Sequence, residues 1–97
     1  IEIIPEKFFV YNNYPNPFNP VTTIRYDLPD IRNVEIVIYD LLGRIIKTLN
    51  LNEVPGGRHE FKWYGENQFG NKVSTGIYFF QLTAGQEMQI QKMLLLK

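Results

Sequence analysis

The side chains that could perform acid–base or nucleophilic chemistry are few and scattered along the chain. His59 is the single histidine and Ser74 the single serine. A Ser–His–Asp set would need Asp27, Asp30 or Asp40 as its third member, and Ser74 lacks the G-x-S-x-G pattern that exposes a nucleophile on a tight turn. His59 falls on an alternating, partly apolar segment, so we interpret it as structural. The sequence therefore predicts a protein that is not an enzyme.

Glycines punctuate the polar segment 65–76, "GENQFGNKVSTG". No Lys-Ser/Thr pair follows them, so they do not make a phosphate-binding loop, and we interpret them as turn glycines. Glu66, Asn67 and Asn71 could supply oxygen ligands to Ca²⁺. The simpler interpretation is that water and backbone groups satisfy these side chains. We expect no metal, no cofactor and no small-molecule substrate.

Aromatic side chains make up 14% of the chain, which raises the possibility of a sugar-binding platform. On alternating strands most aromatic residues face the core. Strand alternation or loop placement leaves Tyr11, Tyr14, Phe18, Tyr64 and Phe69 exposed. A carbohydrate-binding module of a secreted hydrolase is therefore one alternative function.

The composition indicates one small domain with a neutral surface. The 97 residues can build a single core, and Lys plus Arg number 10 against 10 Asp plus Glu. Nucleic-acid binding rests mainly on positive charge, so we expect no nucleic-acid partner. The absence of cysteine excludes disulfides and thiolate metal sites. Because the sequence begins "IEIIPEKF", without a start Met or signal peptide, we expect a module of a longer protein.

Short alternating segments separated by turn residues predict strands and no helix. The segments are "FFVY" (8–11), "TTIRYDL" (22–28), "VEIVIYD" (34–40), "RIIKTLNL" (44–51), "RHEFKWY" (58–64), "IYFFQLT" (77–83) and "MQIQKMLLLK" (88–97). This rhythm predicts an all-β fold, an antiparallel immunoglobulin-like β-sandwich of six to seven strands, with a small barrel as the alternative. We expect residues 1–10 to be a linker from a preceding domain and residues 11–97 to be the folded domain.

Three local features refine this expectation. Without a disulfide, Trp63 should pack against aliphatic side chains. Pro55-Gly56 should form a type II turn, and Gly85 a hairpin with positive φ. The apolar phase of the last strand slips between Ile90 and Met93, which predicts either a bulge or a face shared with a partner.

The segment "NYPNPFNP", residues 13–20, holds three prolines and three asparagines, and we call it the strap. Proline fixes its own φ and favours extended conformations in the preceding residue. Such a segment cannot be a helix or a central strand. We interpret the strap as a stiff hinge along the first sheet edge, which holds the domain apart from whatever precedes it.

Five segments occur together in one order: "NYPNPFNPVTTIRYDLP", "VEIVIYDLLGRIIKTL", "PGGRHEFKWYG", "GNKVSTGIYFFQL" and "KMLLLK". Together they closely resemble the type A C-terminal sorting domain of the bacterial type IX (Por) secretion system, over nearly the whole chain. They are also similar to the immunoglobulin-like part of the flagellar hook-cap protein. One departure is Tyr64, in "WYG", where the sorting domains usually have Asp.

The resemblance implies a non-catalytic domain that directs export of a larger cargo protein across the outer membrane. The cargo would be the N-terminal part of the same chain, and the partner would be the outer-membrane translocon. The protein would be secreted or bound at the cell surface, by way of the periplasm. The hook-cap likeness leaves a second possibility, a structural immunoglobulin-like spacer or assembly module.

Residues that match the family motifs have structural explanations. Asn16 should cap backbone groups beside its proline neighbours, Asp40 and Arg44 should pair across a hairpin, and Tyr78 should fill the core. The matching positions are Pro15, Asn16, Pro17, Asp40, Gly43, Arg44, Gly76 and Tyr78, with Lys92 and Lys97.

The end of the chain is the predicted recognition surface. Charge on an otherwise apolar last strand adds nothing to packing, although it can also protect an exposed edge. We hypothesise that a translocon component adds a strand to this edge, with the lysines setting the register. The predicted recognition residues are Lys92, Met93, Leu94, Leu95, Leu96 and Lys97.

Overall fold

The structure, a computed structural model, describes residues 3–96, which form two β-sheets without a helix. Each strand coincides with a segment in which inward and outward side chains alternate, as the period of a sandwich strand requires. Over the same range no helix has the length and apolar character to cross a membrane. The strands are β1 (Phe9–Val10), β2 (Thr22–Leu28), β3 (Arg32–Asp40), β4 (Ile45–Val54), β5 (Gly57–Trp63), β6 (Gly76–Ala84) and β7 (Glu87–Leu95).

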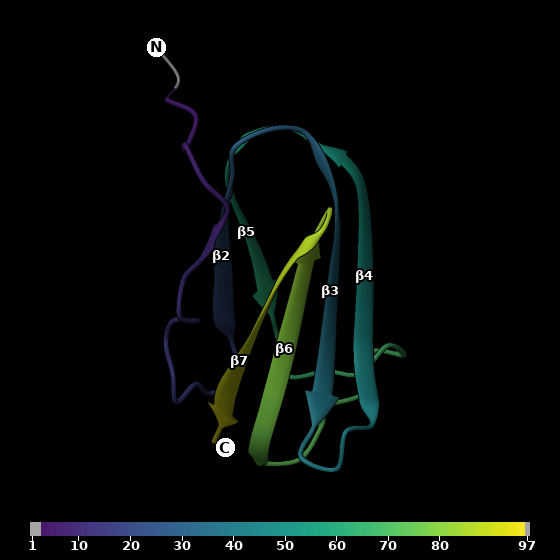
Figure 1. Ribbon diagram of the computed structural model, residues 1–97. Helices are drawn as coiled ribbons and strands as arrows, with labels where there is room; N and C mark the ends of the chain where they lie inside the picture. The colour runs from purple at the N-terminus through teal and green to yellow at the C-terminus, as the bar shows by residue number, and fades with distance from the viewer. Residues whose placement is uncertain (1–2, 97) are drawn as a thin grey trace.

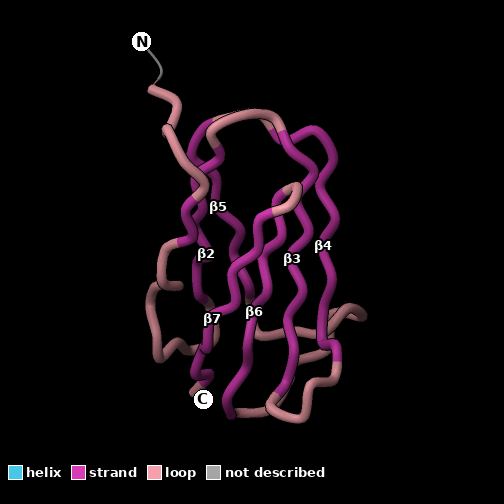
Figure 2. The backbone as a smooth tube through the Cα atoms, viewed as in Figure 1, coloured by secondary structure: helices cyan, strands magenta, loops and turns pink. Residues whose placement is uncertain are grey.

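The strands divide into a three-stranded sheet, in the order β1-β2-β5, and a four-stranded sheet, in the order β4-β3-β6-β7. All neighbouring strands pair antiparallel. Figures 1 and 2 show the sheets packed face to face, with the chain crossing between them after β2, β4 and β5. The predicted antiparallel immunoglobulin-like sandwich is confirmed, rather than the small barrel, and every predicted strand is present.

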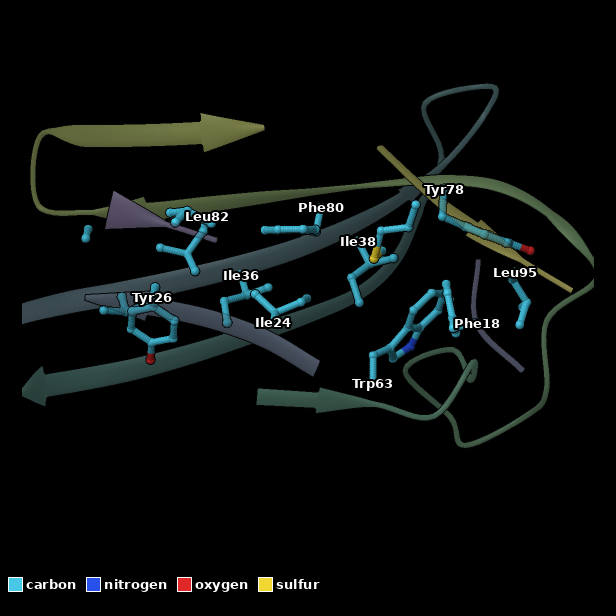
Figure 3. Packing of buried hydrophobic residues seen from close by; sticks show 14 of the residues in the cluster. Phe18, Ile24, Tyr26, Ile36, Ile38, Trp63, Tyr78, Phe80, Leu82 and Leu95 are labelled. Carbon is cyan, nitrogen blue, oxygen red and sulfur yellow. The ribbon is translucent and has the colours of Figure 1, made fainter. Parts of the chain in front are cut away.

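The inward-facing residues of both sheets form one core. Figure 3 shows Trp63 at one end of this core with Phe18 and Tyr78 near it, and Tyr26 at the other end. The centroid of the Trp63 side chain lies 5.6 Å from that of Phe18 and 5.4 Å from that of Tyr78. The expectation of purely aliphatic neighbours for Trp63 is therefore wrong, because aromatic rings from the strap and β6 reach it.

The strap joins the two sheets. Tyr14 forms a β-bridge with Thr23 of β2, and Phe18 forms one with Leu95 of β7. Phe18 is only 2% exposed, which corrects its prediction as an exposed aromatic. The strap does run along the first sheet edge, but it is fixed at both sheets and therefore is not a free hinge. Its cis peptide bonds precede Pro15, Pro17 and Pro20.

The folded unit begins before residue 11, the boundary that the sequence predicted. Phe9 and Val10 pair with β2 as strand β1, and Val10 is buried in the core. The half-buried ring of Phe8 packs against the same core.

The prediction of a type II turn at Pro55-Gly56, after β4, is also wrong, since the backbone takes positive φ at Glu53 and Gly57. A type II turn needs positive φ at Gly56.

The last strand contains no bulge. β7 pairs with β6 in unbroken register from Ala84–Glu87 to Gly76–Leu95, and Gly85 in the connecting turn has the predicted positive φ, 63°. The apparent slip in phase arises because both faces of β7 carry apolar side chains. The sequence offered two explanations, a bulge or a face shared with a partner. The structure excludes the bulge, and the second explanation stays a prediction.

Candidate functional site

The predicted recognition residues divide between the two faces of β7. Met93 is 0% exposed and Leu95 is 1% exposed, because both point into the core. They are therefore unavailable to a partner in the folded domain, which contradicts their place in the predicted set. Leu94 is half-buried, whereas Lys92 and Leu96 are exposed. The last predicted residue, Lys97, lies outside the described residues.

The side chain of Asn16 caps the outer edge of β7. Its Oδ1 accepts a hydrogen bond from the Leu94 N–H, 3.0 Å away, and its Nδ2 donates to the Lys92 C=O, 3.3 Å away. The carboxamide thus replaces a peptide group of a neighbouring strand. The predicted role of Asn16 within the strap is wrong: the Pro15 C=O instead accepts from the Thr22 hydroxyl, at 2.8 Å.

The backbone of Phe18 continues this cap. Its N–H donates to the Leu94 C=O at 3.0 Å, and its C=O accepts from the Leu96 N–H at 2.9 Å. These bonds follow directly from those of Asn16, so the strap seals the edge of β7 from the Lys92 C=O to the Leu96 N–H. The hypothesis that a translocon strand adds to unpaired backbone at 92–97 is therefore wrong for the described residues. Figure 1 shows the strap beside the lower part of β7 only.

The preceding part of the β7 edge has no such cap. Paired residues in an antiparallel ladder alternate between those that bond each other and those whose N–H and C=O point away. Leu94 turns both groups toward the strap, so Met88, Ile90 and Lys92, at even spacing before it, also face away from β6. Within residues 3–96, the N–H and C=O of Met88 and Ile90 and the N–H of Lys92 have no other partner.

The outer face of the four-stranded sheet is unusually apolar. Val37 on this face is 5% exposed even though no second layer covers it. Met88 and Ile90 are each 51% exposed. The outward-facing apolar residues of the sheet and the end of the chain are Val37, Tyr39, Ile45, Ile77, Phe79, Met88, Ile90, Leu94 and Leu96. The alternation of the β7 sequence contains this signal, but the recognition surface predicted from the sequence covered only residues 92–97 and left out Met88 and Ile90.

The β3–β4 hairpin confirms the structural roles predicted for Asp40, Gly43 and Arg44. One carboxylate oxygen of Asp40 accepts from the N–H groups of Leu42 and Arg44, at 3.0 and 2.9 Å. The other oxygen accepts from the Arg44 guanidinium at 2.7 Å. Gly43 has a φ of 82°, which favours glycine. Burial would raise the pKa of Asp40, but the bonds from Arg44 and Leu42 outweigh it, so the pKa lies below its ordinary value.

The predicted core role of Tyr78 is also confirmed. Its side chain is 4% exposed, and its hydroxyl donates to the Ser74 C=O at 2.6 Å. Gly76, where β6 begins, opens the strand that carries Tyr78 into the core. These residues therefore organise the end of the sandwich around Trp63.

The side chains that could have carried chemistry have structural partners. A ring nitrogen of His59 lies 2.7 Å from the Pro55 C=O, and the ring packs beside Tyr26. Asp27 accepts a hydrogen bond of 2.6 Å from the Tyr11 hydroxyl, and this bond raises the pKa of Tyr11. Ser74 contributes its backbone to the core contact described above. None of these arrangements forms a Ser–His–Asp set.

The loop proposed as a calcium site is held by internal bonds. Glu66 forms an ion pair with Lys47 at 3.1 Å. The Asn67 side-chain oxygen accepts from the N–H groups of Phe69 and Asn71, at 2.9 and 3.0 Å. Across residues 3–96 no group of three or more His, Cys, Asp or Glu side chains could hold a metal ion. The exposed aromatics Tyr14, Tyr64 and Phe69 belong to the strap and to the connection after β5.

Comparisons with known proteins agree with this fold. A model of the FlgD Ig-like domain matches residues 21–87. The basal-body rod modification protein FlgD of Salmonella typhimurium is 37% identical over 51 residues, which cover 53% of this chain and 22% of that protein. The match thus spans about a fifth of the curated relative's length.

Solved structures extend the likeness over more of the chain. The dimeric latent PorU from Porphyromonas gingivalis has a TM-score of 0.74 at 25% identity, over 97% of this chain and 10% of that chain. PorZ from the same organism, described as an essential surface component of the type-IX secretion system, has a TM-score of 0.64 at 23% identity. That match covers 91% of this chain and 11% of PorZ, and it shows the fold alone.

Proposed function

The chain belongs to the FlgD Ig-like domain family, and from this premise we propose that it is a non-catalytic module that binds other proteins. Within that class we propose that it serves as a sorting domain for type IX secretion. It would direct a cargo protein, to which it is fused, through an outer-membrane translocon to the cell surface or beyond.

The likeness to PorU carries this proposal. It covers 97% of this chain, including the strap and β7, whereas the FlgD family model matches residues 21–87 and leaves both out in large part. The strap and the C-terminal segment are two of the motifs that resemble the sorting domains. A FlgD structure from Xanthomonas campestris also covers 94% of this chain, at a TM-score of 0.60, so the sorting role rests on the sequence motifs together with the higher TM-score of PorU.

The shape of the molecule agrees with such a role. It is elongated, with extents of 41 × 22 × 20 Å. The described N-terminal segment and the end of β7 lie at opposite ends in Figure 1. A cargo domain that precedes Ile3 would be attached at the end of the sandwich opposite the C-terminal segment. The cargo would therefore leave the C-terminal segment accessible.

A structural spacer or assembly module is the second candidate, and the family match favours it. An export assay separates the two candidates. The full chain is fused to the C-terminus of a fluorescent protein that carries a signal peptide, in a bacterium with a type IX system. A sorting domain sends fluorescence to the surface or the medium, and the same reporter without the domain remains in the periplasm. Equal retention of both reporters contradicts the sorting function and leaves the spacer.

A further inference from the structure

We infer that the open edge of β7, formed by Met88, Ile90 and Lys92, is a docking site for an extended segment of a partner protein. The segment adds to the four-stranded sheet as a further strand and places an acidic side chain opposite Lys92. The identity of this partner as a component of the export machinery rests on the proposed function. The docking geometry itself rests on the β7 edge.

Other edges of the two sheets are protected in ways that natural β-proteins use. The connection after β5 covers the first part of β4, since the Gln68 N–H donates to the Ile46 C=O at 2.9 Å and the Gln68 side chain accepts from the Thr48 N–H at 2.7 Å. The free edge strand β5 exposes the charged side chains of Arg58 and Lys62, with Glu60 between them. β1 and the strap line the edge of β2.

The open part of β7 has neither a cover nor a charged row. Its outward side chains Met88 and Ile90 are apolar and each 51% exposed. Glu87, on the opposite face, is held by Arg32 in an ion pair of 2.8 Å. Unpaired backbone beside exposed apolar side chains is a known liability for uncontrolled pairing. Its retention here is explained if a specific strand occupies it.

The spacing of the free groups selects an extended chain as the occupant. N–H and C=O groups recur at every second residue from Met88 to Lys92, over about 13 Å. Only another β-strand offers acceptors and donors at the same repeat, as in recognition by strand addition. A helix or a small molecule could satisfy few of these groups at once.

The charge of the edge selects the side chains of that strand. Met88 and Ile90 would lie beside apolar partners, and Lys92 beside a residue of opposite charge, since opposite charges across a strand pair are favourable. The strap also limits the length of the docked segment, because Asn16 already holds the Lys92 C=O. A docked strand therefore covers residues 88–92 and stops where the strap begins.

The chain itself shows that β7 accepts a strand at this edge. The Phe18 backbone makes paired bonds to Leu94 and Leu96, and the bridge between Phe18 and Leu95 is parallel. The partner would continue on the same side of β7 what the strap does at residues 92–96.

Ile90→Pro tests the docking geometry directly. The Ile90 N–H points away from β6, so proline removes an outward donor and leaves the β6–β7 ladder intact, as on natural edge strands. Its ring also blocks an approaching strand. The control variant is Phe69→Lys, which changes an apolar side chain that is 87% exposed in the connection after β5, away from β7.

The probe is a synthetic peptide, Thr-Glu-Thr-Val-Thr-Val-Thr, which places one glutamate and two valines on the same face of a strand, at the spacing of Lys92, Ile90 and Met88. It is titrated into the full chain and followed by amide NMR. We expect chemical-shift changes and slower hydrogen exchange at Met88, Ile90 and Lys92. In Ile90→Pro the dissociation constant should be about tenfold larger, the equivalent of one lost main-chain hydrogen bond. The same peptide with lysine in place of the glutamate should bind a few-fold more weakly. No change at these amides, or equal binding by Ile90→Pro, overturns the inference.

Two further readouts separate the inference from the proposed function. In the export assay, Ile90→Pro should lower export about tenfold for the same reason, while Phe69→Lys exports normally. If the unaltered fusion is not exported but the peptide binds at β7, the sorting function fails and the docking site stands. Analytical ultracentrifugation tests a second copy of this chain as the occupant of the edge. If the free chain forms a dimer that Ile90→Pro abolishes, a second copy occupies the edge, which contradicts the proposed partner.

Discussion

At the scale of single residues, the carboxamide of Asn16 makes the two hydrogen bonds that a peptide group of a neighbouring strand would make. It accepts from the Leu94 N–H and donates to the Lys92 C=O. We expect Asn16→Ala to lower the free energy of unfolding by about 1 kcal/mol, since both bonds are exposed and water replaces part of them. Urea unfolding measures the loss. Asn12→Ala, at an exposed position just before the strap, is the control, and an equal effect of both variants would contradict the assigned role.

Asp40 makes stability depend on pH at the acidic end. The N–H groups of Arg44 and Leu42 and the Arg44 guanidinium overcome the effect of burial and lower the pKa of Asp40 in the folded state. The ionised carboxylate therefore stabilises the fold above its unfolded pKa, about 4, and this stabilisation is lost as the pH falls through the folded pKa. We expect Asp40→Asn to melt at a lower temperature than the unaltered chain at pH 7. At pH 3 the difference between their melting temperatures should be smaller. A constant difference at both pH values would exclude this contribution.

At the scale of elements, the strap behaves as part of the core. Phe18 is 2% exposed and packs against Trp63, so we expect Phe18→Ala to cost about 3–5 kcal/mol of unfolding free energy. Phe69→Ala, at a residue 87% exposed, should change it by less than about 0.5 kcal/mol. Denaturant melts of both variants provide the comparison. Similar small losses would show that the strap is not a structural element.

Truncation of the last element should destroy the fold. Removal of residues 92–97 deletes Met93 and Leu95, which are buried in the core. We expect the shortened chain to show no cooperative thermal unfolding by circular dichroism. Loss of export on truncation would therefore not identify a recognition signal. Lys92→Ala combined with Leu96→Ala alters only exposed side chains and should leave a cooperative transition, which makes it the appropriate variant for export assays.

The strands themselves could be predicted from the sequence because alternation is a local signal. The segment 22–28 and the hairpin at Asp40 contain all the information that places them, either in their period or in their turn residues. The strap could not be predicted in this way. Its partners on β7 are far along the chain, as for Asn16 and Leu94, and proline-rich sequence has no period that reports which side chain turns inward.

The candidate site was predicted in its element but not in its residues. The apolar last strand with its lysines indicated a surface of unusual character, and β7 is indeed an edge strand. The sequence could not show that the strap seals the second half of that edge, because this depends on a contact between the two ends of the domain. The open groups at Met88 and Ile90 follow only from the three-dimensional pairing.

At the scale of the whole molecule, the two sheets form a sandwich, and the docking site that we propose lies at one edge, on β7. The three-stranded sheet is bordered by β1 and by the charged strand β5, and the connection after β5 covers part of β4. On the outer face of the four-stranded sheet, Gln81 and Thr83 of β6 lie between the pair Met88 and Ile90 and strand β3. A strand added to β7 would therefore cover the local apolar pair Met88 and Ile90.

Amide hydrogen exchange on the full, unaltered chain in its free, monomeric state measures this edge directly. A sealed segment beside an open one should give slow exchange at Leu94 and Leu96 and fast exchange at Met88, Ile90 and Lys92. The amides of β7 that bond β6 should remain protected throughout. Strong protection at Met88 and Ile90 in the monomer, or rapid exchange at Leu94 and Leu96, would contradict the account.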